Sequence, residues 1–337
     1  MTGLEERYRR LLRLLPAAYR ARWAEEMVDT FLLTAMPAAE ADPDRAQFVA
    51  DFGRPSLAEA WSVLTLAVRL RLGAGDPAGQ GASRAAAYGA AVRLVGLISL
   101  LLLAAPTGIS VATLVIFSRH QGQLEYAAPG PWWWLSTVAG LLWVGAYVAV
   151  VGGSRRTRTP LAMLALALST VAVGRLILAG WSTWPAAAGD VAYLLLGLVP
   201  LAALPAFHPD APPVRPGPWL AALPVAMSAA AALALLNAAG IDPLLDLPGI
   251  HDLLLLAITA GYLGTRRHAH WPLALAILAA TALAVRLVSL LSYARYTGLH
   301  LLLAAGITEA ALLFGALLAL VPLARRDLAA RPVTTPP

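Results

Sequence analysis

The sequence predicts an all-α, polytopic membrane protein, with a bundle of about eight membrane helices preceded by a small soluble domain of three helices. Three observations predict it. First, 59% of the residues are hydrophobic, only 13% are charged and the mean hydropathy is +0.69, whereas soluble domains are about half apolar and a quarter charged. Second, apolar runs long enough to cross a bilayer, about 20 residues each, recur after residue 90. Third, charged residues are concentrated in residues 1–84, which hold eleven Arg and eleven acidic residues, whereas the remaining 253 residues hold fourteen Arg and eight acidic residues. A soluble domain therefore precedes the membrane domain.

Charge and composition together divide the chain into four parts. The stretch GAGDPAGQGAS is rich in glycine and proline, which indicates a flexible linker. The first residues mix acids and arginines without an apolar core, so they do not resemble a cleavable signal peptide, and we expect the N-terminus in the cytosol. The predicted parts are a cytosolic helical domain (1–72), the linker (73–84), a transmembrane domain (85–323) and a disordered cytosolic tail (324–337).

Three apolar stripes at helical spacing predict the helices of the first domain. Pro16 suits the first turn of the second helix, and Ser56 with Glu59 forms a capping box that opens the third. The basic first helix could also lie on anionic lipid, but its two glutamates and the domain's balanced charge favour packing between helices. The stripes are Leu4, Tyr8, Leu11 and Leu15; Tyr19, Trp23, Met27 and Phe31; and Leu57, Trp61, Leu64 and Val68.

The same segment resembles the HAAS domain, a small helical cytosolic domain of bacterial membrane proteins, and the permease-prefix segments of actinobacterial ones. The matching positions are Leu15–Pro16, Glu25 with Glu26, and the run Phe52-Gly53-x-Pro55-x-Leu57-Ala58. The resemblance covers only the part of the chain before the linker, and it implies a regulatory module that binds a cytosolic protein, such as a PadR-type transcription regulator. The residues expected to contact that partner are Tyr8, Tyr19, Trp23, Glu25, Glu26 and Trp61.

Arginines predict the orientation of the bundle. The loops expected on the inner side carry nine arginines, whereas the outer loops carry only Arg119 and Arg295, and cytoplasmic loops are the basic ones. We therefore expect both termini inside and the chain in the plasma membrane, as a multi-pass protein. The predicted spans are 90–117, 132–151, 160–180, 190–207, 218–239, 250–264, 271–293 and 299–322.

Two of the spans share an arginine pattern. Arg175 follows an Arg-Arg pair that begins at position 155, and Arg286 follows a pair that begins at position 266, with the same spacing in both; a Pro-Leu-Ala begins both spans. The copies are four spans apart, so they would insert in the same orientation. This spacing is compatible with a parallel four-plus-four repeat, or with chance similarity between Ala- and Leu-rich helices.

An arginine in the hydrocarbon region needs a partner or water, because its insertion costs several kcal/mol. Arg286 is fifteenth in a span starting at 272, and Glu309 is fourteenth from the inner end of the next, antiparallel span at 322. Equal depth predicts an ion pair between these two residues. The pair could be a structural clamp or, alternatively, a site for an ion or substrate. A transport site generally contains more than two polar groups, which favours the clamp. Nearer the outer surface, Arg175 could pair with Asp190 or reach water.

A short outer loop gathers four groups that could ligate a cation: Asp242, Asp246, His251 and Asp252. Acids in an exposed loop are more commonly just solvated, so we predict no metal site. The sequence has no cysteine, no phosphate-binding or dinucleotide motif and no catalytic signature. An enzyme is the least supported class, and we expect no cofactor and no direct contact with nucleic acid.

Two functions remain. The first is a membrane-anchored regulatory protein whose N-terminal domain binds a partner, while the bundle senses a signal or serves as the anchor. The alternative is a transporter or permease component with a pathway at the repeat interface. The spans hold few polar residues to line a route, which favours the first. A cavity lined by Arg286, Glu309 and further polar groups would favour the second.

Overall fold

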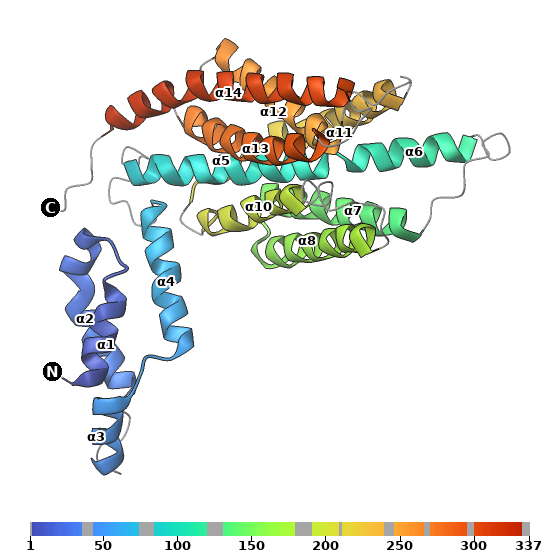
Figure 1. The fold of residues 1–337 in the computed structure, drawn as a ribbon. Coiled ribbons are helices and arrows are strands. Elements are labelled where there is room, and N and C mark those ends of the chain that lie inside the picture. The colour runs from blue at the N-terminus through green and yellow to red at the C-terminus, as the bar shows by residue number, and fades with distance from the viewer. Residues whose placement is uncertain are drawn as a thin grey trace. The chain divides into compact units, whose positions relative to one another are not determined.

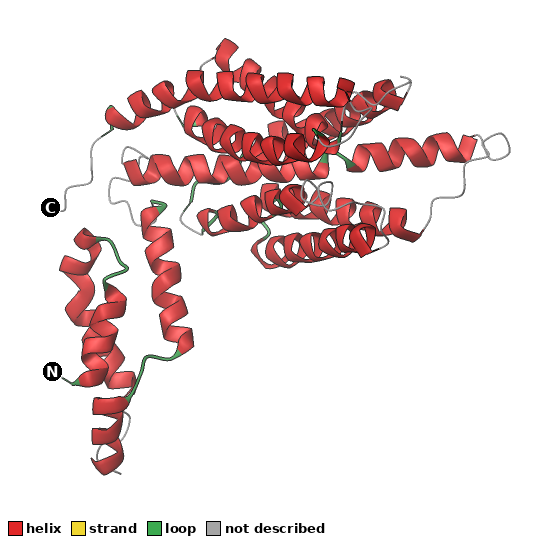
Figure 2. Ribbon diagram, viewed as in Figure 1, coloured by secondary structure: helices red, strands yellow, loops and turns green. Residues whose placement is uncertain are grey.

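The computed structural model describes residues 2–35, 43–73, 84–119, 131–178, 191–208, 211–238, 246–265, 270–294 and 300–331. Within these ranges every regular element is a helix (Figures 1 and 2). The chain forms two compact units: the first is essentially Met1–Ala90, and the second holds Ala91–Phe207 and Pro212–Ala329. The all-helical prediction is therefore confirmed.

The first unit contains four helices rather than the predicted three: α1 (Gly3–Leu12), α2 (Ala17–Ala35), α3 (Pro43–Phe52) and α4 (Leu57–Arg71). The sequence analysis missed α3 because its two large apolar side chains, Phe48 and Phe52, are exposed and so do not form a core stripe. The predicted capping box opens α4: Ser56 Oγ accepts from the N–H of Glu59, whose carboxylate accepts from the N–H of Ser56.

The core of the first unit centres on Tyr8 of α1, whose ring stacks on Phe31 of α2 with centroids 4.0 Å apart. Here the predicted face of α4 is wrong: Leu57 is 90% and Trp61 69% exposed. Smaller side chains of α4 pack into the core instead, because the Tyr8–Phe31 stack already fills its centre. The buried residues of this core are Leu4, Tyr8, Leu12, Leu15, Val28, Phe31, Val63 and Ala67.

Among the described residues, seven helical segments, the first of them Arg84–Val115, are long and apolar enough to cross a membrane, which makes this a multi-pass membrane protein. The fourth predicted span corresponds to a shorter apolar helix, Val191–Ala206. The helices are α5 (Arg84–Ala104), α6 (Thr107–Arg119), α7 (Pro131–Val151), α8 (Arg155–Leu178), α10 (Leu198–Ala203) with η1 (Leu204–Ala206), α11 (Pro216–Ala238), α12 (Leu247–Thr265), α13 (Trp271–Tyr293) and α14 (His300–Ala329). Helix α14 continues beyond the predicted domain end at residue 323, into the predicted tail. Arg326 lies in its last turn, where a positive charge interacts favourably with the helix dipole.

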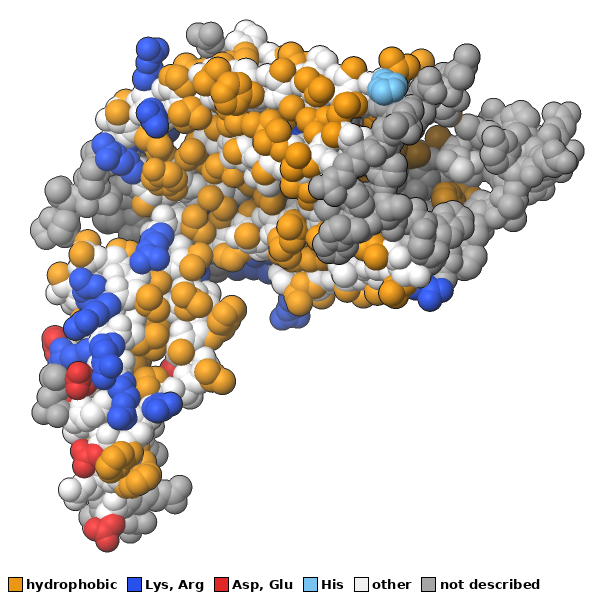
Figure 3. Space-filling view, viewed as in Figure 1, with side chains coloured by type: hydrophobic (Ala, Val, Ile, Leu, Met, Phe, Trp, Pro, Cys, Tyr) orange, Lys and Arg blue, Asp and Glu red, His pale blue; other side chains and the backbone are white. Residues whose placement is uncertain are grey.

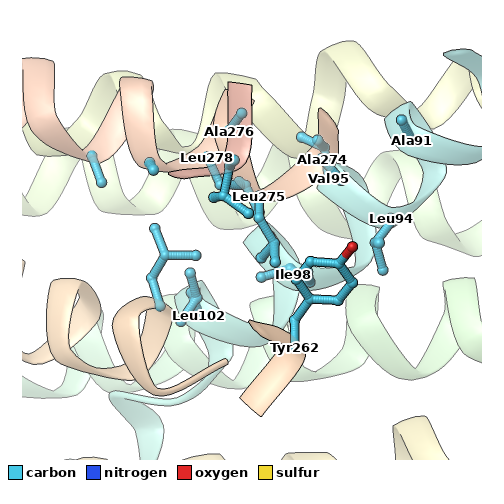
Figure 4. Packing of buried hydrophobic residues seen from close by; sticks show 14 of the residues in the cluster. Ala91, Leu94, Val95, Ile98, Leu102, Tyr262, Ala274, Leu275, Ala276 and Leu278 are labelled. Carbon is cyan, nitrogen blue, oxygen red and sulfur yellow. The ribbon is translucent and has the colours of Figure 1, made fainter. Parts of the chain in front are cut away.

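Helix α5 is the centre of the second unit, with α12, α13 and α14 on one side and α7, α8 and α10 on the other (Figure 1). Both sides of α5 are apolar, as expected for a helix buried all round. Figure 4 shows Ile98 and Leu102 of α5 among side chains of α13, such as Leu275, and beside the ring of Tyr262 from α12. The visible surface of this unit is mostly hydrophobic (Figure 3), as expected for lipid contact.

The two proposed repeats pair their helices differently. In the first half α8 packs mainly against α7, the preceding span, whereas in the second half α13 packs mainly against α14, the following span. Helix α10, in the segment Val191–Ala206 that would correspond to α14, makes only a small contact with α8. The sequence similarity therefore does not extend to the arrangement of the helices.

Candidate functional site

The strongest polar cluster of the second unit surrounds Arg286, near the middle of α13. Its side chain is completely buried. Three carboxylates converge on it: Asp246 directly before α12, Asp252 in the second turn of α12, and Glu309 on α14. We call these four residues the Arg286 cluster.

Each nitrogen of the guanidinium faces a different carboxylate. Nε donates to Asp252 Oδ2 at 2.8 Å, and Nη1 lies 3.0 Å from both oxygens of Asp246. Nη2 lies 2.6 Å from Glu309 Oε2. One arginine thus connects three helices, and the hydrogen bonds from Nε and Nη1 are charge-assisted, which is the strong kind.

Local structure explains why Asp246 reaches the cluster. It precedes the first residue of α12, and its Oδ1 accepts from the backbone N–H of Gly249 at 2.7 Å, so it caps the helix. Its Oδ2 also accepts from the Tyr293 hydroxyl at 2.5 Å. The carboxylate is therefore held by the end of α12, by α13 and by the arginine.

Gly249 leaves the space that the cluster occupies. A Cβ at this position would lie 2.9 Å from each of three atoms, Arg286 Nη2, Asp246 Oδ1 and Glu309 Oε1. Two of these atoms belong to tightly held groups that cannot simply swing away. A glycine is therefore required here by close approach rather than by backbone conformation.

The structure brings together Arg286 and Glu309, the pair expected from equal depth. It also adds Asp246 and Asp252, which the sequence analysis placed in a solvated loop. That expectation is wrong: Asp252 is 3% exposed. Helix α12 starts at Leu247, so Asp252, at the edge of the predicted span, lies in its second turn and faces Arg286. An unusually short apolar span that begins directly after several acids was the available signal.

The second predicted charge pair is not part of this cluster. Arg175 is exposed in the last turn of α8. Its expected partner Asp190 lies outside the described residues, as does Asp242 of the predicted outer loop. Among the residues described, no three acidic or histidine side chains are arranged to hold a metal ion.

A second polar contact lies beside the cluster. His251 Nδ1 is 2.8 Å from the carbonyl of Leu247, so this nitrogen carries a hydrogen, and Nε2 is 3.1 Å from the hydroxyl of Tyr193. His251 and Asp252 border a cavity of about 40 Å³. This space is large enough for a water molecule.

A larger cavity of about 350 Å³ lies between the α5–α6 junction, α7, α8 and the start of the Val191–Ala206 helix. Its wall is mainly apolar, with hydroxyl groups from Thr107, Ser110, Ser136, Ser169 and Tyr193. Neither Arg286 nor Glu309 lines it. The large cavity and the Arg286 cluster are therefore separate features.

The residues expected to contact a partner differ in accessibility. Tyr8 lies in the core, where no partner can reach it directly. Glu25 forms a two-point ion pair with Arg9 across α1 and α2, at 2.6 and 2.8 Å. Trp23 is partly exposed beneath the guanidinium of Arg22, whose carbon lies 5.1 Å from the ring centroid.

Two other predicted contact residues, Glu26 and Trp61, are exposed, and Tyr19 is half-buried. Phe48 and Phe52 are 64% and 66% exposed; the sequence analysis did not count either among the contact residues, and it named Phe52 only as part of the HAAS resemblance. It also assigned Leu57 to the core. An apolar side chain is naturally expected to be buried, and only the packing of α3 and α4 shows that these three are not.

No protein-family model, curated protein or solved structure matches this chain.

Proposed function

We propose that this chain is a membrane-anchored regulatory protein whose N-terminal helical domain binds a cytosolic protein. The observation that carries the proposal is an exposed row of large apolar side chains on α4. Leu57, Trp61 and Leu64 are 90%, 69% and 41% exposed, and their spacing places them on one face of the helix. We call these three residues the α4 stripe; hydrophobic side chains are visible along α4 in Figure 3.

The energetics favour a covered stripe. Burying a large apolar side chain is worth about 1.5 to 3 kcal/mol, so three on one helix face make an effective docking surface. The domain does not need them for its own fold, because its core is filled from the other side of α4. A partner with an apolar groove would recognise residues at this spacing. The HAAS resemblance suggests a PadR-type regulator as that partner.

The bundle would hold this domain at the plasma membrane, with eight crossings and both termini inside. The excess of inner-loop arginines supports this orientation. Contacts at both ends of the short helix support the eighth crossing: Arg158 Nη2 donates to the carbonyl of Phe207 at 2.9 Å, next to the start of α8, whereas Tyr193 meets His251 near the start of α12. Val191–Ala206 would then return the chain to the inner side.

The alternative, a transporter component, has less support. A pathway through Arg286 and Glu309 requires a cavity that contains them, and the larger cavity does not. The guanidinium is instead enclosed by three carboxylates from its own chain. These contacts favour the structural clamp, with the bundle as anchor or sensor.

Site-specific photo-crosslinking in cells tests the docking surface. A photoreactive amino acid at Leu57 or Leu64 of the full chain should yield an adduct with a cytosolic protein. The matched control is Ser62, which is also exposed on α4 but points about 140° away from Leu57 around the helix. Trp61→Glu should reduce the adduct at Leu57 without affecting membrane insertion.

The outcomes separate the possibilities. A protein adduct at Leu57 and Leu64, absent at Ser62 and absent when Trp61 is changed, supports the proposal. Adducts only with lipid would show that α4 lies on the membrane surface. Equal adducts at all three positions would mean that the stripe is not a specific docking surface.

A further inference from the structure

The Arg286 cluster contains more acids than bases. If Asp246, Asp252 and Glu309 were all ionised, the cluster would carry a net charge of −2, because Arg286 is its only cation. An uncompensated charge is costly at a buried position. A net charge of −2 between α12, α13 and α14 would strongly favour binding of a positively charged species.

No further positive side chain among the described residues compensates this charge. On α12 the neighbouring titratable group is His251, which is bonded to the carbonyl of Leu247 and to Tyr193. Tyr293 of α13 donates a neutral hydrogen bond. Helix α11 and the helix Val191–Ala206 hold no charged residue. Helix α5 has only Arg84, at its start, and Arg93, whose Nη1 donates to the carbonyl of Ala206.

Hydrogen-bond donors are distributed unevenly over the three carboxylates. Asp246 accepts from the N–H of Gly249, from Tyr293 and from Nη1 of the arginine. Asp252 accepts from Nε and also borders the small cavity, which has room for water. Both carboxylates thus accept a hydrogen bond from the guanidinium.

Glu309 lacks this support. Its side chain is 4% exposed, and its Oε1 is buried without a hydrogen-bond partner among the described groups. Its Oε2 is close to Arg286 Nη2, yet Nη2 makes no hydrogen bond of acceptable geometry. Glu309 is therefore the least stabilised anion of the three.

We propose that the Arg286 cluster is a proton-binding site and that Glu309 holds the proton. In the binding step the carboxylate takes up one proton and becomes a carboxylic acid. The net charge of the cluster then changes from −2 to −1. A metal ion fits less well, because the guanidinium already occupies the centre of the three acids and no metal-like arrangement exists among the described residues. This inference does not depend on the partner proposed for the N-terminal domain.

Protonation would regulate how tightly three helices are joined. With the proton bound, the cluster is nearer neutrality and α12, α13 and α14 are held together. Loss of the proton restores the repulsion between carboxylates. Protonation of Glu309 should therefore stabilise the folded protein, and this stabilisation should be lost as the pH rises and the proton leaves.

Infrared difference spectroscopy on the full chain in lipid nanodiscs tests the proposal directly. The carbonyl band of a buried carboxylic acid should be present at neutral pH and should disappear on raising the pH. Glu309→Gln should remove this band, and Glu309→Asp should shift it. Asp327→Asn, which changes a carboxyl of α14 outside the cluster, is the matched control and should retain the band.

Thermal melting provides an independent readout. Glutamine resembles the protonated acid, so Glu309→Gln should melt close to the natural protein at neutral pH but should lose the decline at higher pH. Asp246→Asn keeps the helix cap but should melt at a lower temperature, because it removes the carboxylate charge that faces Arg286 Nη1.

Three results would overturn the proposal. One is an acid band that persists in Glu309→Gln, and another is a loss of melting temperature in that variant as large as in Asp246→Asn. The third is melting that responds to replacing sodium with choline at constant pH and does not respond to pH, which would identify a bound metal cation instead. If the variants do not fold, the natural protein still decides, since absence of any acid band at every pH where it is folded contradicts a bound proton.

Discussion

Arg175 and Arg286 occupy matching places in the sequence and opposite environments in the structure. Each follows an Arg-Arg pair at the same spacing, in a span that begins with Pro-Leu-Ala. Arg175 is exposed in the last turn of α8, whereas Arg286 is fully buried in α13 between three carboxylates. The neighbouring helices, rather than the spans that carry the arginines, determine this difference.

The following span illustrates the cause. Helix α14, which follows α13, supplies Glu309 and packs along it, whereas the helix that follows α8, Val191–Ala206, contains no acidic residue. An arginine near the end of a span is tolerated where the side chain reaches water, and the C-terminal end of a helix favours a cation. A position in a repeat therefore does not specify the role of its residue.

The largest expected effect compares the two arginines directly. Arg286→Leu leaves three buried carboxylates without their cation, which should cost on the order of 3 to 5 kcal/mol. Arg175→Leu changes an exposed residue and should alter stability by less than about 0.5 kcal/mol. Thermal melting of both variants in the same detergent checks the contrast. Similar losses would show that the two environments are energetically alike.

A double substitution distinguishes a pair from the larger cluster. If only Arg286 and Glu309 were paired, replacing both with leucine would recover most of the stability. With Asp246 and Asp252 also present, two acids remain unpaired, so Arg286→Leu/Glu309→Leu should stay well below the natural protein. Melting of the single and double variants measures the coupling. Full recovery would mean that the two aspartates do not depend on the arginine.

Gly249 offers a smaller and cleaner test. Gly249→Ala introduces a Cβ 2.9 Å from three polar atoms of the cluster, and overpacking of this kind costs about 1 to 3 kcal/mol. Gly261→Ala on the same helix is the control, since nothing lies within 4 Å of its Cβ position. There the alanine should be neutral or stabilising by up to about 1 kcal/mol. Equal melting temperatures would indicate that the cluster is loosely packed.

The same contrast shows how far sequence reasoning extends. Composition and the length of the apolar runs were sufficient to predict the long helices, because a helix needs about 20 apolar residues to cross a bilayer regardless of which helices surround it. Counting depth along antiparallel spans sufficed to bring Arg286 and Glu309 together. Both inferences use distances along single helices.

What could not be predicted depends on contacts between helices. Asp252 was assigned to a solvated loop because it lies at the edge of a predicted span, and its position along one helix does not show that it faces Arg286. The buried face of α4 was inverted, because periodicity identifies the largest apolar stripe and not the one that fits beside Tyr8 and Phe31. Packing selected Val63 and Ala67 instead.

The smallest predicted effect concerns an arginine at the surface. Hydrogen bonds from the guanidinium of Arg9 lower the pKa of the Glu25 carboxyl. A carboxyl whose pKa is lower in the folded state stabilises the fold above its unfolded value, about 4.3 for glutamate. This contribution is lost as the pH falls through the folded pKa. The effect should be slight, because both side chains are exposed and salt screens such pairs.

Hydrogen exchange of α1 and α2 in the full chain measures this effect. Glu25→Gln should make exchange in these helices faster near neutral pH and should reduce the difference between neutral and acidic conditions. Glu26→Gln is the matched control, because Glu26 is the next residue in the sequence and is also exposed, and it should leave exchange unchanged.

High salt should weaken the Arg9–Glu25 contribution but not that of the Arg286 cluster, since buried pairs are screened much less. If salt instead affects both sites equally, water reaches the cluster, and the distinction between its arginine and the exposed ones does not hold.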